Sequence, residues 1–210
     1  GYGFLMFSDH DFFTSEESLR KWNSCGMVLI PGNEVYGNPH ILHADADRYM
    51  PREVLRQDML NNITAAERET GRGFAIINHP NWLADFDHCT LEQMLEWTGY
   101  LGIEIYNGVI GRLDGSQYAL DKWDLLLSAG RRVWGFANDD SHKDVDVELG
   151  WNVAYVRQKT IPGVVEALRN GRFYCSTGVV IKSIRVEGMK IILETENACR
   201  IAAIQNVGKR

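Results

Sequence analysis

Short apolar runs of strand length recur along the chain, and most of them are separated by a segment with helical periodicity. The predicted strands are residues 4–8, 27–30, 74–77, 103–106, 133–137 and 153–156. The predicted helices are residues 15–25, 51–70, 91–100, 117–129 and 162–170, where apolar residues recur about every 3.6 positions. Because strand and helix alternate, the sequence predicts an α/β fold built on a parallel sheet or barrel.

Local signals mark the ends of the predicted helices. Thr14-x-x-Glu17 and Thr90-x-x-Gln93 have the capping-box spacing, in which a hydroxyl group and a side chain three positions later bind each other's backbone amides. Helix ends are expected at four glycines, which are Gly26, Gly71, Gly130 and Gly171. These signals therefore predict where individual helices begin and end.

The pattern changes after Gly178. From there the chain reads as short strands over residues 181–186, 190–195 and 200–204, with no helix between them. About 30 residues are too few to fold on their own. The sequence therefore predicts an α/β unit over residues 1–178 and a small β extension over residues 179–210 that packs on it.

Composition excludes several classes of protein. Of the 210 residues, 45% are hydrophobic and 24% are charged, which is typical of a globular domain and not of a disordered tail. The net charge of −6, with scattered Lys and Arg, disfavours a nucleic-acid scaffold. No apolar run approaches the roughly 18 to 20 residues that span a bilayer, so no membrane role is expected.

Cysteine usage and the start of the chain favour a cytoplasmic protein. The four cysteines, Cys25, Cys89, Cys175 and Cys199, form no C-x-x-C pair and are predicted to be reduced thiols. The chain opens at Gly1 directly into an apolar strand, without the features of a signal peptide. The sequence leaves the oligomeric state open.

Most histidines and several acidic residues follow the carboxyl ends of the predicted strands. The segments that carry them are residues 8–11, 32–34, 39–43, 78–80 and 138–142. Because the ends of parallel strands form one rim, we expect these residues to converge. Imidazole and carboxylate groups bind Zn, Mn or Fe, and a carboxylate can bridge two ions, so a multinuclear metal centre is predicted. The remaining histidine, His88, is interpreted as a surface or helix-entry residue.

Six motifs resemble, in order and spacing, those of the polymerase and histidinol phosphatase (PHP) family. They are residues 7–11 (FSDHD), 30–34 (IPGNE), 40–42 (HIL), 77–80 (INHP), 102–107 (GIEIYN) and 140–142 (DSH). The resemblance covers about residues 3–178. Residues 171–178 and the strands after them resemble the stand-alone branch with a small β extension, which includes carbaryl-hydrolase-like enzymes. The resemblance implies a distorted (β/α)7 barrel with two or three divalent ions at its rim.

The resemblance also implies roles for individual residues. Glu34 would bridge two ions, one of which His40 and His79 would also hold. His43 competes with His40 for this role, and the H-I-L context favours His40. Asp140 would bind the other bridged ion. The expected catalytic residues are Glu34, His79 and Asp140.

The other polar residues of the rim have less specific roles. By the same resemblance, His10 and His142 would share a third ion. Asp9 and Asp11 would either orient imidazoles from behind or stabilise the loop. Asn107 and Asn138 face the predicted rim and could contact the substrate or a metal-bound water.

One feature departs from the family pattern. Family members begin with an H-x-H motif on a first strand, followed by a helix, whereas this sequence contains no H-x-H. Either the sequence lacks that strand and helix, or the chain is a degenerate member with an incomplete site. The first alternative is favoured because a barrel without its first strand would leave an open edge.

Three functions are compatible with these residues. The leading one is hydrolysis of a phosphoester in a small phosphorylated metabolite or nucleotide, because clustered divalent ions activate a bound water and neutralise developing charge. The second uses the same metal centre on a carboxylic or carbamate ester. The third is a metal-binding domain without turnover, which the absence of H-x-H would explain.

Overall fold

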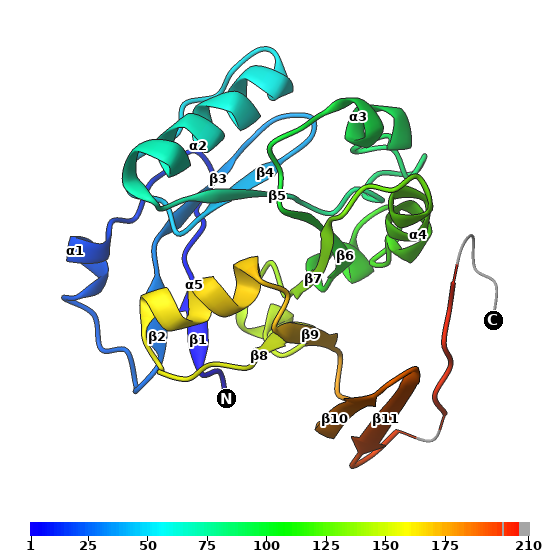
Figure 1. Ribbon diagram of the computed structural model, residues 1–210. Coiled ribbons are helices and arrows are strands. Elements are labelled where there is room, and N and C mark those ends of the chain that lie inside the picture. The colour runs from blue at the N-terminus through cyan, green and yellow to red at the C-terminus, as the bar shows by residue number, and fades with distance from the viewer. Residues whose placement is uncertain (199, 206–210) are drawn as a thin grey trace.

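A five-stranded sheet lies at the centre of the fold (Figure 1). Its strands, in spatial order, are β3 (Gly32–Val35), β4 (Ile41–Ala44), β5 (Phe74–Ile77), β6 (Gly102–Asn107) and β7 (Trp134–Asn138). Strands β3, β4 and β5 pair antiparallel, and β5, β6 and β7 pair parallel. This computed structural model describes residues 1–198 and 200–205, so Cys199 lies outside the described residues.

Three further sheets contain two strands each. The pairs are β1 (Phe4–Met6) with β2 (Val28–Ile30), β8 (Trp151–Ala154) with β9 (Phe173–Ser176), and β10 (Ile181–Glu187) with β11 (Lys190–Thr195). The predicted α/β class is confirmed, but the central sheet is mixed and not wholly parallel as predicted. Across the described ranges, however, no sheet closes into a seven-stranded barrel. Strands β1 and β8 do not pair, and both line a cavity of about 910 Å³.

The helices occupy the positions expected from periodicity, and all but α5 are shorter than predicted. They are α1 (Glu16–Leu19), α2 (Arg56–Thr70), α3 (Leu91–Glu96), α4 (Leu120–Ser128) and α5 (Ile161–Arg169). The capping box of Thr90 and Gln93 is confirmed at the start of α3. The box predicted at Thr14 is wrong, because Ser15 caps α1 while the Thr14 hydroxyl donates to Asp9. No helix in the described part is both long and apolar enough to cross a membrane.

The two faces of the central sheet carry separate hydrophobic clusters. One face packs under α2, α3 and α4, and its members include Ile41, Ile77, Ile103, Met59 and Leu126. The other face packs against α5, and its members include Leu42, Ile76, Phe136, Val164 and Leu168. Consecutive strand residues thus point to opposite layers. This alternation decides which side chains can reach the rim.

Several segments differ from the predicted pattern, since Ile41–Ala44 and Phe173–Ser176 form strands that were not predicted. Residues 32–34 were expected only to follow the strand before them, but Gly32–Val35 forms its own strand because it pairs with β4. Beyond β11, residues 200–204 form no strand. The β10–β11 hairpin projects from the rest of the chain in Figure 1, with Val186 and Met189 exposed. The domain division near residue 178 stays a prediction.

Candidate metal centre

Glu34 is the hub of a buried polar cluster. Its carboxylate, 2% exposed, has Oε1 at 2.8 Å from Nδ1 of His40, 2.9 Å from Nδ2 of Asn78 and 3.4 Å from Nε2 of His79. Its Oε2 lies 3.2 Å from Nε2 of His10. Burial raises the pKa of Glu34, but the hydrogen bonds from the three histidines outweigh burial and hold this pKa well below its ordinary range. Glu34 is therefore ionised.

Backbone pairing brings these residues together from three parts of the chain. His10 forms a parallel bridge with Glu34, and His40 directly precedes β4. Asn78 N–H, just after β5, donates to the His40 carbonyl oxygen at 3.1 Å. His79 follows with φ of 27°, in the left-handed region that non-glycine residues rarely adopt. The predicted convergence of these residues is present, but Glu34 lies within β3 and His40 lies at the amino end of β4, so not all of them follow the carboxyl ends of parallel strands.

The donor atoms form two overlapping groups that could hold a metal ion. In the first group, the ligand atoms of His10, Glu34 and His40 all lie within 4.8 Å of one another. In the second group, the same holds for His40, His79 and His88. Nitrogen and carboxylate donors of this kind fit a divalent transition metal.

His88 is buried inside the cluster, so its interpretation as a surface residue is wrong, although it does lie two residues before Thr90, the N-cap of α3. It is 2% exposed, and its ring centroid lies 4.8 Å from that of His40, 4.7 Å from that of His79 and 4.9 Å from that of Trp82. Burial lowers the pKa of His88 to about 2. The segment folds back on itself, since His88 N–H donates to the Trp82 carbonyl.

A second buried carboxylate, Glu104 in β6, was not assigned a role from sequence. It accepts hydrogen bonds from the His79 amide at 2.6 Å, Asn107 Nδ2 at 2.8 Å and Asn138 Nδ2 at 2.7 Å. Burial raises the pKa of Glu104 to about 7. The two asparagines thus bind a carboxylate. A lone acidic residue within an apolar strand was the sequence signal that could have revealed it.

Asp140 and His142 lie beside this network, just after β7. Oδ2 of Asp140 accepts from Asn107 at 3.2 Å, and burial, followed by the charge of Glu34, raises the pKa of Asp140. The Asp140 backbone has φ of 56°. The His142 ring centroid lies 5.6 Å from that of His10, and both side chains are partly exposed. The assignment of these residues as metal ligands stays a prediction.

Asp9 and Asp11 hold the loop that carries His10. The Asp9 carbonyl accepts from the Glu34 amide at 3.2 Å. Asp11 accepts from the Tyr36 amide at 2.9 Å and pairs with Arg52. Burial raises the pKa of Asp11, but these two contacts outweigh burial and lower it. Of the two roles expected for these acids, the contacts support stabilisation of the loop.

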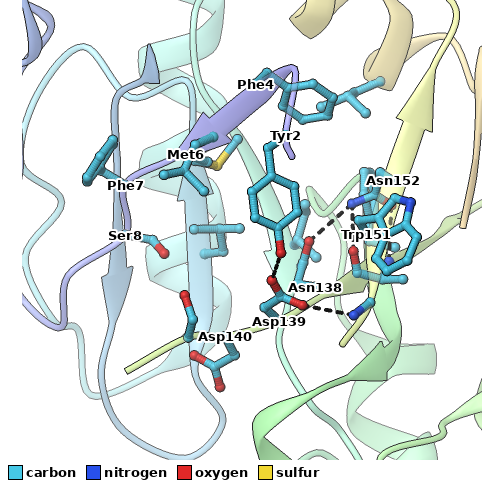
Figure 2. Close-up of a pocket in the computed structure, with 18 of the residues that line it drawn as sticks. Tyr2, Phe4, Met6, Phe7, Ser8, Asn138, Asp139, Asp140, Trp151 and Asn152 are labelled. Carbon is cyan, nitrogen blue, oxygen red and sulfur yellow. Dashed lines mark hydrogen bonds between the residues drawn. The ribbon is translucent and has the colours of Figure 1, made fainter. Parts of the chain in front are cut away.

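The 910 Å³ cavity opens directly beside the centre (Figure 2). Its polar end is lined by residues that include His10, Glu34, Glu104, Asp140 and His142. In Figure 2, Phe4 and Met6 lie on one side and Trp151 and Asn152 on the other. The Tyr2 hydroxyl donates to Asp139, whose other oxygen accepts from the Gly150 amide at 2.8 Å. The centre therefore adjoins a space large enough for a small metabolite.

His43 lies away from the centre because of strand alternation. Glu34 pairs across β3 and β4 with Leu42, whereas His43 pairs with Asn33 on the opposite face. His43 is fully buried, and neither ring nitrogen has a hydrogen-bond partner within the described residues. Burial lowers the pKa of His43 to about 4. Of the two alternatives, only His40 contacts Glu34.

The buried His43 gives a testable pH dependence. The unfolded chain binds a proton at His43 below its ordinary pKa of 6.5, whereas the folded chain does so only near pH 4. The free energy of unfolding should therefore fall between pH 6.5 and 4 by up to about 3 kcal/mol from this group. Urea unfolding at pH 7 and pH 4 should show a smaller difference in His43→Leu. An unchanged difference would contradict this assignment.

Comparison with known proteins supports the fold. No protein-family model and no curated protein matches the sequence. The structure is similar to a crystal structure of a two-domain protein containing a predicted PHP-like metal-dependent phosphoesterase from Bacteroides vulgatus, with a TM-score of 0.61 and 16% identity. The match covers 91% of this chain and 66% of that chain, just under two thirds of its length. This likeness confirms the PHP resemblance at the level of the fold.

Proposed function

We propose that this chain is a metal-dependent phosphoesterase that cleaves a small phosphorylated molecule. The observation that carries the proposal is the ionised, buried Glu34 carboxylate in contact with three histidine rings. The predicted PHP-like, metal-dependent phosphoesterase in the structural neighbour supports it. We also propose that residues 1–178 belong to a distorted (β/α)7 barrel, with residues 179–210 as a β extension packed on it.

The donor set suits Zn, Mn or Fe as two or three ions. Glu34 would bridge two of them, with His40 and His79 on one and Asp140 on the other. His10 and His142 would share the third. When bound, such ions lower the pKa of a coordinated water and neutralise charge on a phosphoryl oxygen.

The chain's own residues prepare this site. Glu34 supplies negative charge where the histidines converge. Glu104 accepts from the His79 backbone amide and fixes the side-chain amides of Asn107 and Asn138. The adjoining cavity gives the substrate a partly enclosed place beside the centre. Together these contacts hold the reactive groups in place before substrate binds.

A matched pair of substrates tests the reaction class. p-Nitrophenyl phosphate and p-nitrophenyl acetate share a leaving group, so a difference in rate reports on the bond attacked. We expect elemental mass spectrometry to find two or three ions per chain. We also expect metal-dependent turnover of the phosphate ester, and we expect this turnover to be lost in Asp140→Asn. Turnover of the acetate alone would instead favour the carboxylic ester alternative, which the apolar part of the cavity could accommodate. Bound metal without turnover of any ester would favour a binding domain.

A further inference from the structure

We infer that His88 is a positioning residue of the metal centre, which holds the His40 backbone and the His79 ring in place and does not itself bind an ion. This inference rests on the proposed function, because the ligand roles of His40 and His79 belong to it. The proximity of His88 to both residues makes a ligand role the obvious alternative. The hydrogen bond from the His40 amide to His88 favours the positioning role over the ligand role.

The Nε2 lone pair of His88 already accepts a hydrogen bond. Its Nε2 lies 2.9 Å from the backbone nitrogen of His40 and accepts that N–H. In a neutral imidazole the other ring nitrogen carries the proton, so Nδ1 of His88 has no lone pair to offer a cation. Binding an ion through either nitrogen would break this hydrogen bond and leave the buried His40 amide without a partner.

The hydrogen bond from the His40 amide to His88 fixes the backbone that directs the His40 side chain. The His40 amide donates to His88, and the His40 carbonyl accepts from the Asn78 amide. Both sides of His40 are therefore fixed, and its Nδ1 is held 2.8 Å from Glu34. The His88 ring also packs against His79, with 4.7 Å between ring centroids.

His88 itself is held rigidly by the segment around it. His88 N–H donates to the Trp82 carbonyl and Cys89 N–H to the Pro80 carbonyl, each at 3.2 Å. Nζ of the buried Lys122 donates at 2.7 to 2.9 Å to three carbonyl oxygens of this segment, those of Pro80, Phe86 and Cys89. These contacts fix the backbone that carries His88, while the ring is held through Nε2, since its buried Nδ1 has no hydrogen-bond partner among the described residues.

Substitutions at His88 separate a positioning role from a ligand role. His88→Gln places a carbonyl oxygen near the position of Nε2 and can still accept from the His40 amide. His88→Leu cannot accept, and His43→Leu is a matched control at a buried histidine outside the centre. Zinc affinity is measured on the full chain by competition with a chromophoric chelator. We expect His88→Leu to weaken zinc binding by about 10- to 100-fold, His88→Gln to restore most of the affinity, and His43→Leu to match the unmodified chain.

Equal losses in the Leu and Gln variants would indicate a ligand role and overturn the inference, as would unchanged affinity in His88→Leu. If His88→Leu does not fold, His88→Asn replaces it, because its shorter side chain places no acceptor at the Nε2 position. Hydrogen exchange of the His40 amide is a second readout that needs no metal. It should be slow in the unmodified chain and in His88→Gln, and fast in the variant without an acceptor. Absence of zinc binding in the unmodified chain would contradict the proposed function, while the exchange rates would still test the role of His88.

Discussion

Replacing Glu34 by Gln is expected to remove bound metal and to lower hydrolysis by about a thousandfold or more, which corresponds to about 4 kcal/mol of lost transition-state stabilisation. Glu34 is the carboxylate that His10, His40 and His79 all contact. Gln keeps the size of the side chain but removes its charge, and its amide N–H₂ can bind no cation. Elemental analysis and steady-state kinetics on the same preparation measure both effects.

The matched control for this experiment is Glu17→Gln. Glu17 is exposed, and its carboxylate forms a surface ion pair with Lys21 and is not one of the groups that make up the cluster. We expect Glu17→Gln to retain full metal content and activity. Thermal unfolding of both variants shows whether the fold is intact. Normal metal content and activity in a folded Glu34→Gln protein would refute the proposed centre.

Lys122→Met is expected to lower the free energy of unfolding by about 3 kcal/mol. The Lys122 ammonium group is buried and donates to three backbone carbonyls. Met keeps the apolar stem of the side chain but leaves those oxygens without their donor. Urea unfolding of metal-free protein measures the change directly.

The control for this change is Lys21→Met, at an exposed lysine of a surface ion pair. We expect an effect of less than about 1 kcal/mol there. Because Lys122 holds the segment that carries His88, Lys122→Met should also speed hydrogen exchange of the His40 amide. A stability equal to that of the unmodified chain would show that water replaces Lys122 at no cost, contrary to this prediction.

Local patterns in the sequence predicted much of the architecture. The strand at residues 74–77 appears with the predicted bounds, and the capping box at Thr90 starts α3 as expected. These features depend on residues close in sequence, so they are visible without the fold. The antiparallel pairing of β4 with β3 and with β5 was not visible in this way, because strand direction depends on which edges meet in space.

The sequence by itself determined the chemistry available to the centre, since it supplies the imidazole and carboxylate donors, which are His10, Glu34, His40 and His79. The tertiary structure alone decided how that chemistry is arranged. Because side chains alternate along β4, His43 points into the layer under α2. His88 is buried, and its Nε2 accepts a hydrogen bond from the amide of His40, 48 positions earlier in the chain. The physical reason is that strand pairing sets the face to which a side chain points, and that a distant backbone amide becomes a hydrogen-bond partner only when the folded chain brings it close.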